Sequence, residues 1–295
     1  MESTEPSMNK FISLTVILAL FAIPLISHSQ EIRTGGESSD FTLAVKLYND
    51  GMYDLARAQF QHFIETYPES QLSVDARFYL GLTLLSLHRY SEARTTFQNF
   101  AMTYQDHPKA PEAWWNVGEC YALEKNYREA ATAFERLTVF YPKSSRAPEA
   151  LLNAARYFIA VKDTDDAKQS LRTVLQNYVS SPQVVTARMK LAEIMASQGN
   201  LAAAKAELNR IINTTSDPEQ KLDAQLALVS ILDQAGELDQ ATNLITTLSK
   251  QTNAKIALTS GLLALSLGDA EKAAAQFLIA SSDVHPSKEI SRKPQ

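Results

Sequence analysis

The sequence predicts an all-α protein, an α-solenoid of about seven antiparallel helix pairs. Its main support is a set of alanines 37 residues apart, with a last step of 32 residues. We call them the marker alanines: Ala56, Ala93, Ala130, Ala167, Ala204, Ala241 and Ala273. A large apolar residue stands four residues after each marker alanine. The residue 12 positions before it is small in most copies. Moreover, only nine glycines occur in 295 residues, which argues against a turn-rich β fold. Since one pair cannot bury its apolar face alone, stacked neighbours are expected to share a core.

Residues 111–142, PEAWWNVGECYALEKNYREAATAFERLTVFYP, show one helix pair most clearly. Pro111 suits the first turn of a helix, where a missing N–H group costs nothing. Gly118 and Ala130 are small, as two antiparallel helices require where their axes cross closely. The second helix is expected to end at Tyr141, because the residue before a proline is disfavoured in the helical region. Between these limits the apolar residues recur at helical spacing, at Trp114, Val117, Tyr121, Tyr127, Phe134 and Leu137.

The order of aromatic, glycine, tyrosine, alanine, phenylalanine and proline in this stretch resembles a tetratricopeptide repeat. The strings YPKSSRAPEALLNAARYF (141–158) and WWNVGECYALEKNYREAATAFERLTVFYPKS (114–144) are also similar to repeat proteins of the Gram-negative cell envelope. They resemble the repeat domain of the Tol–Pal-associated cell-division coordinator family and, more distantly, the outer-membrane assembly lipoprotein BamD. This resemblance implies a right-handed superhelix of helix pairs in the periplasm.

The amino-terminal segment predicts export from the cytoplasm. Residues 11–26 form an apolar run between Lys10 and Ser27-His28-Ser29, a pattern typical of a secretory signal peptide that is cleaved after Ser29. The initiator is Met1 or Met8. The alternative is an uncleaved membrane tether, for which sixteen residues are short. We therefore divide the chain into a signal peptide (1–29), a flexible lead-in (30–39), the solenoid (40–280) and a disordered tail (281–295).

In such stacks the first helix of each pair lines a concave groove, at positions 15, 11 and 8 residues before the marker alanine. The predicted groove residues are Phe41, Tyr48, Phe78, Leu82, Leu85, Trp115, Glu119, Leu152, Arg156 and Met189. An apolar strip of this kind is suited to an apolar peptide or an amphipathic helix. Trp115 is the expected main anchor, and Arg156 could pair with a carboxylate of the partner. For each single residue, packing between repeats is the alternative interpretation.

Composition and motifs argue against catalysis. A net charge of −5 offers no basic face for nucleic acid. The five histidines are scattered, with no pair at the spacing of a helical metal site, and no phosphate loop or nucleophile elbow occurs. Cys120 is expected to be a small packed residue. We therefore expect no enzyme activity, metal or cofactor.

These observations predict a non-catalytic scaffold for protein–protein interaction in the periplasm of a Gram-negative bacterium. Its partners would be envelope proteins, in outer-membrane assembly or division-linked envelope maintenance, and it would not span the membrane after signal cleavage. Two alternatives stay open. The chain could be a glycan- or peptidoglycan-binding accessory protein or enzyme partner, or another copy could fill part of the groove and give a homo-oligomer.

Overall fold

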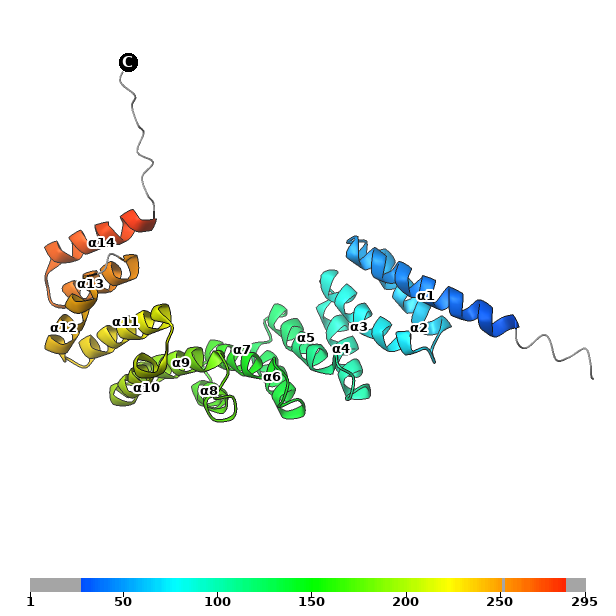
Figure 1. The fold of residues 1–295 in the computed structure, drawn as a ribbon, viewed down its shortest axis with the longest axis horizontal. Coiled ribbons are helices and arrows are strands. Elements are labelled where there is room, and N and C mark those ends of the chain that lie inside the picture. The colour runs from blue at the N-terminus through cyan, green and yellow to red at the C-terminus, as the bar shows by residue number, and fades with distance from the viewer. Residues whose placement is uncertain (1–27, 251–252, 285–295) are drawn as a thin grey trace, which may run out of the picture. The chain divides into compact units, whose positions relative to one another are not determined.

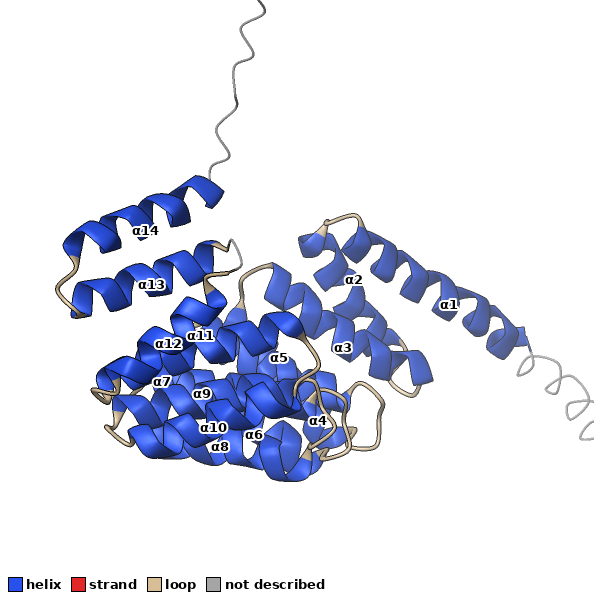
Figure 2. Cartoon of the chain, turned by 60° about the vertical axis from the view of Figure 1, so that its left-hand side comes forward, coloured by secondary structure: helices blue, strands red, loops and turns tan. Residues whose placement is uncertain are grey.

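The computed structural model describes residues 28–250 and 253–284, and these residues form helices and short connections without any strand (Figure 2). The predicted all-α fold of helix pairs is confirmed. The chain divides into two compact units, residues 1–126 and 127–295, which we describe one at a time.

Five helices of the described residues belong to the first unit (Figure 1): α1 (His28–Asn49), α2 (Tyr53–Thr66), α3 (Gln71–Ser86), α4 (Tyr90–Thr103) and α5 (Ala110–Leu123). Nine belong to the second: α6 (Tyr127–Phe140), α7 (Ala147–Ala160), α8 (Thr164–Asn177), α9 (Gln183–Ser197), α10 (Leu201–Thr214), α11 (Pro218–Gln234), α12 (Leu238–Leu248), α13 (Ala254–Ser266) and α14 (Ala270–Val284). Helices adjacent in the sequence pack together within each unit.

The start of the first unit differs from the predicted lead-in. Residues 30–39 belong to α1, although they include two glycines and favour helix weakly. Two side-chain contacts hold this part of α1 against the connection between α2 and α3. The Tyr67 hydroxyl donates to Asp40 Oδ2 at 2.9 Å, and the Ser70 hydroxyl donates to Glu37. Tertiary contacts therefore override a weak local preference.

The predicted signal peptide and tail lie largely outside the described residues. At the carboxyl end, α14 continues to Val284, so residues 281–284 are helical and not part of a disordered tail. Within the described ranges, none of the helices combines the length and apolarity that a membrane span needs.

Small residues allow the two helices of a pair to approach closely. A Cβ atom added to Gly81 of α3 would lie 2.6 Å from the ring of Phe97 in α4. A Cβ atom added to Gly261 of α13 would likewise lie 2.6 Å from the ring of Phe277 in α14. Real Cβ contacts are longer than this, so each phenylalanine occupies the space that a side chain would need. These are the small and large positions that flank the marker alanine in the sequence.

The turn inside each pair has the same backbone form seven times. The first helix ends with a residue of positive φ, and paired backbone hydrogen bonds close the turn, such as His88 N to Leu85 O and Arg89 N to Leu84 O. Glycine takes the positive φ at Gly51, Gly199, Gly236 and Gly268, whereas His88, Lys125 and Lys162 adopt it at 58° to 61°. The four glycines therefore act as left-handed caps at the ends of these first helices.

Successive pairs are joined through the first helix of the later pair. In the first unit, the Tyr79 ring of α3 lies 6.2 Å from Phe41 and 5.9 Å from Tyr48 of α1, and 5.7 Å from Phe60 of α2. In the second unit, Tyr157 of α7 stacks on rings of α6 in the same manner. Each first helix therefore covers the pair before it.

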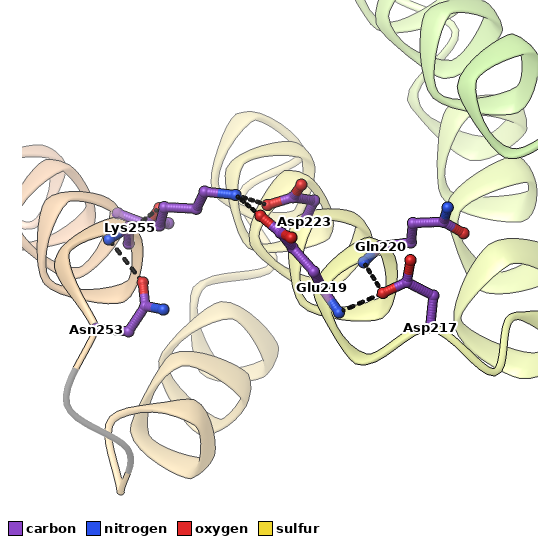
Figure 3. Close-up of polar contacts among 7 residues, drawn as sticks. Asp217, Glu219, Gln220, Asp223, Asn253 and Lys255 are labelled. Atoms are coloured by element: carbon purple, nitrogen blue, oxygen red, sulfur yellow. Dashed lines mark hydrogen bonds and ion pairs between the residues drawn. The ribbon is translucent and has the colours of Figure 1, made fainter.

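Polar contacts fix the last pair on its predecessor (Figure 3). Lys255 at the start of α13 reaches back to α11, with Nζ 2.8 Å from Asp223 and 3.2 Å from Glu219. Asn253 caps α13 by accepting from Lys255 N at 2.8 Å, and Asp217 caps α11 in the same way. The start and the rotation of α13 are thereby set.

Candidate binding surface

The first helices of the pairs form a continuous surface in each unit. In the first unit α1 contacts α3, and in the second unit α7 contacts α9, α9 contacts α11 and α11 contacts α13. We call the residues at the predicted groove positions of these helices the first-helix surface. The predicted residues divide between the units, with Phe41 to Glu119 in the first and Leu152 to Met189 in the second.

In the first unit, the aromatic residues of this surface are engaged in packing. Phe41 and Tyr48 are half-buried, and their rings pack on Tyr79 of the following pair. Phe78 is only 5% exposed and lies between Phe97 and Phe100 of α4, at 5.6 and 5.4 Å. The prediction that Phe78 lines an open groove is therefore wrong. Its ring packs on the partner helix of its own pair, whereas the alternative interpretation was packing between repeats.

The other predicted residues of the first unit keep part of their surface accessible. Leu82 and Leu85 of α3 are half-buried, as are Trp115 and Glu119 of α5. The neighbouring Trp114 is buried. Of the two tryptophans, Trp115 is thus the one with accessible surface.

In the second unit, α7 offers a charged group to solvent. Arg156 is exposed, and its guanidinium donates to the Tyr157 hydroxyl at 2.7 Å and lies 4.6 Å from the centre of that ring. Leu152, one turn earlier, is half-buried. The ring holds the guanidinium beside the first-helix surface, where it can meet a carboxylate.

The clearest concavity on this surface is a cavity of about 380 Å³ between α9 and α11. Met189, Glu193 and Ala196 line it from α9, at positions 15, 11 and 8 before the marker Ala204. All three groove positions thus open into one space. Its volume lies within the range of sites that take a small ligand or a single large side chain.

The opposite wall of this cavity was not predicted. Ala227, Ser230, Ile231 and Gln234 of α11 line it. Ser230 stands 11 residues before the marker Ala241, so extending the register by one pair would have identified it. Ala227, Ile231 and Gln234 do not stand 15, 11 or 8 residues before Ala241. A cavity between two helices is lined by residues from more than one face of each helix, so these three positions alone could not identify them.

The cavity joins an apolar interior to polar groups. Met189, Ala192, Leu208 and Ile231 provide apolar atoms, while Glu193, Ser197, Ser230 and Gln234 provide carboxylate, hydroxyl and amide groups. Glu193 pairs with Lys190 on the same helix at 2.8 Å, and both are exposed. The arrangement can take an apolar side chain and hydrogen-bond the backbone or polar group beside it.

Two kinds of reactive site, a nucleophilic cysteine and a metal cluster, can be examined in the described residues. Burial, together with the nearby Glu124 carboxylate, raises the pKa of the Cys120 thiol to about 12, so it stays protonated and is a weak nucleophile. Across residues 28–250 and 253–284 there is no group of three or more His, Cys, Asp or Glu side chains that could hold a metal ion. Two further cavities, of about 540 Å³ beside Arg77 and about 480 Å³ beside Lys255, lie off the first-helix surface.

The fold and this surface define a helix-pair repeat protein, and the family comparisons agree. Residues 41–100 match the tetratricopeptide repeat family, and residues 97–204 match the tetratricopeptide repeat-like domain family. The chain thus carries tetratricopeptide repeat domains from residue 41 to residue 204. The sequence matches none of the curated proteins.

Two solved structures with TM-scores just above 0.5 share this fold at low sequence identity. The apo form of RapI is 11% identical, with a TM-score of 0.52 over 87% of this chain and 78% of that one. The Naa15/Naa10 complex bound to HypK-THB is 21% identical, with a TM-score of 0.51 over 85% of this chain and 37% of that one. A tetratricopeptide repeat protein from Parabacteroides merdae ATCC 43184 is 17% identical, with a TM-score of 0.49 over 83% of this chain and 92% of that one.

Proposed function

We propose that this protein is a non-catalytic scaffold that binds an apolar peptide or an amphipathic helix of a partner protein on its first-helix surface. The observation that carries the proposal is the cavity between α9 and α11, because all three groove positions of one repeat line it. A side chain of the partner enters this cavity as an anchor, and the polar groups at its wall hold the neighbouring backbone.

The exposed parts of the surface set the chemistry of the partner. Arg156 favours a carboxylate on the bound segment, and Trp115 offers a large anchor in the first unit. Phe78 takes no part, because it is buried. The binding residues of the proposal are therefore Phe41, Tyr48, Leu82, Leu85, Trp115 and Glu119 in the first unit, and Leu152, Arg156, Met189, Glu193 and Ser230 in the second.

The aromatic residues do not favour the alternative of a glycan-binding accessory protein. Sugar stacking needs an open ring face, whereas Phe41 and Tyr48 are half-buried and contact Tyr79, with ring centroids 6.2 and 5.9 Å away. These rings serve the stacking of repeats. A peptide partner agrees better with a cavity whose walls are mainly methyl and methylene groups.

The proposed site of action is the periplasm of a Gram-negative bacterium. The apolar run of residues 11–26 after Lys10 supports export, and the resemblance to envelope repeat proteins supports envelope partners in outer-membrane assembly or division-linked maintenance. A fusion of residues 1–40 to an enzyme that is active only after export tests this. Activity in cells supports export, and inactivity contradicts it.

The binding site is tested by photocrosslinking followed by affinity measurement. A crosslinking residue at Glu193 should capture a partner, whereas one at Asn209, exposed on α10, should not. The captured protein is then purified and titrated against wild type, Ser230→Trp, which fills the cavity, and Asn209→Trp as a matched control. We expect Ser230→Trp to weaken binding by about 10-fold or more, and the control to bind as wild type does. Equal binding by both variants would refute the assignment.

A further inference from the structure

The last helix pair leaves an apolar face uncovered. Leu258 and Leu265 of α13 are 49% and 50% exposed, Leu262 between them is 54% exposed, and Leu278 of α14 is 71% exposed. We call these four residues the end face. Four exposed leucines on one helix pair mark an interaction surface, so this apolar face needs an explanation.

In two earlier pairs, the following pair covers the position of Leu258 or of Leu265, whereas the position of Leu262 is exposed in three earlier pairs, at Arg156, Glu193 and Ser230. Leu226 stands 15 residues before its marker alanine, as Leu258 does, yet it is 7% exposed and shares a core cluster with Ile256 and Leu263 of α13. In the first unit, Tyr48 occupies the register of Leu265 and packs on Tyr79 of the next pair. Leu258 and Leu265 thus present the surface on which a further helix would pack.

The second helix departs from the repeat pattern at the same end. Five residues after the marker alanine the earlier pairs carry polar residues: Gln61, Gln98, Glu135, Arg172, Asn209 and Thr246. These side chains can reach the next pair, since Glu135 accepts a hydrogen bond from Ser170 of α8 at 2.8 Å. The last pair has Leu278 there instead. Both helices of this pair are therefore apolar on their end side.

The spacing of the leucines indicates what covers them. Leu258, Leu262 and Leu265 follow one another at intervals of four and three residues, which is the seam of two packed helices. From residue 256 to residue 268 there is no charged side chain. When the seam meets an identical seam across a two-fold axis, leucine therefore meets leucine and no like charges are opposed.

The carboxyl-terminal residues of the sequence are a poor cover for this face. Residues 285–295, HPSKEISRKPQ, contain Ile290 as their one large apolar residue, together with two prolines and four charged residues. They cannot supply an apolar stripe that matches three leucines. We propose that a second copy of the chain covers the end face, so that two chains associate through α13 and α14 about a two-fold axis.

Mass in solution at increasing concentration tests this dimer, by sedimentation of the full chain. We expect wild type to pass from monomer to dimer, and Leu258→Glu/Leu265→Glu to weaken the dimer by about 100-fold or more, because the axis brings like charges together. The control is Leu43→Glu/Leu55→Glu, whose leucines are similarly exposed, at 46% and 58%, on the first pair. It should dimerise as wild type does. All variants carry the same amino-terminal segment, so their differences report the substitutions alone.

A crosslink supplies a second readout if the double glutamate variant fails to fold. In a Cys120→Ala background, Leu262→Cys places one thiol per chain near the axis, and mild oxidation should give a covalent dimer. A monomeric wild type, a dimer that the glutamates do not weaken, the absence of the crosslink, or masses that grow beyond the dimer would each overturn the proposal. Leu258, Leu262 and Leu265 occupy the groove positions of the last pair, and Ser230 occupies one of the pair before it. The two proposals are read separately, because the leucine variants are judged by mass in solution and Ser230→Trp is judged by titration of the captured partner.

Discussion

Tyr79 lies flat on Phe60, with ring centroids 5.7 Å apart and an interplanar angle of 11°. Tyr79 belongs to the first helix of one pair and Phe60 to the second helix of the pair before it. The same tyrosine also meets Phe41 and Tyr48 of α1. One side chain therefore joins both helices of the first pair to the second pair, which is how a repeat protein becomes cooperative.

Removal of this ring should loosen the first pair. We expect Tyr79→Ala to lower the free energy of unfolding by about 2 to 4 kcal/mol, because a half-buried aromatic residue loses three ring contacts and leaves a cavity. Tyr79→Phe keeps the ring and should stay within about 0.5 kcal/mol of wild type. Urea unfolding followed by circular dichroism measures both. Equal losses in the two variants would mean that the hydroxyl, and not the ring, carries the contact.

The contact of Gly81 with Phe97 predicts a result that a second substitution can reverse. Gly81→Ala places a methyl group 2.6 Å from a fully buried ring, so we expect a loss of about 1 to 3 kcal/mol in unfolding free energy. In Gly81→Ala/Phe97→Leu the smaller side chain leaves room for the methyl group. The double variant should therefore be more stable than the sum of the single effects predicts. Strict additivity would contradict this account.

Glu135 predicts a pH dependence of stability. Burial and the nearby Asp166 raise its pKa, against the opposing effect of the hydrogen bond from Ser170. A carboxyl whose pKa is higher in the folded state binds its proton more tightly there. Its contribution to stability is therefore greatest below its ordinary pKa of 4.5 and decreases as the pH rises through the folded pKa.

Glu135→Gln should remove this decrease, since the neutral amide oxygen still accepts from Ser170. Relative to wild type, the variant should gain unfolding free energy between about pH 4 and about pH 8. Glu65→Gln, which is exposed on α2, is the control and should show no such trend. A gain for Glu135→Gln that is the same at both pH values would refute the burial of the carboxyl.

Cys120 should resist thiol reagents in the native protein. Its side chain is buried and the pKa of its thiol is raised to about 12, so little thiolate exists near pH 8. We expect a disulfide reagent to label it at least about 100-fold more slowly than in the unfolded chain, where a cysteine pKa is near 8.5. Fast labelling of the folded protein would show that α5 opens readily.

The repeat architecture could be predicted because its signals are local and recur. The marker alanine and the large residue after it return seven times, and the small residue before it returns six times, with Val229 as the exception. A chance match at one copy is therefore corrected by the others. The lead-in was different. Residues 30–39 have no such pattern, and they become helical through Asp40 and Glu37, which contact residues about 30 positions away.

The binding surface was harder to predict for a geometric reason. The positions 15 and 11 residues before the marker alanine are four residues apart, which predicts that they share one helix face. In the structure they face different neighbours. Phe78 at the first position packs into α4, whereas Arg156 at the second is exposed. Whether a side chain is covered depends on how its helix is rotated against the neighbouring helices, and a register alone does not contain that rotation.

The turns of positive φ imply that this backbone permits more stability than the sequence uses. His88, Lys125 and Lys162 hold a left-handed conformation that costs a side-chain-bearing residue about 1 kcal/mol, whereas glycine adopts the same form in the other four turns. Glycine at these three sites would relieve the strain and so raise the free energy of unfolding. Part of this gain is lost, because glycine also gives the unfolded chain more conformational freedom. Natural proteins commonly keep such unoptimised positions. For an engineer, they are places to raise the melting temperature of the scaffold without altering either of its proposed contact surfaces.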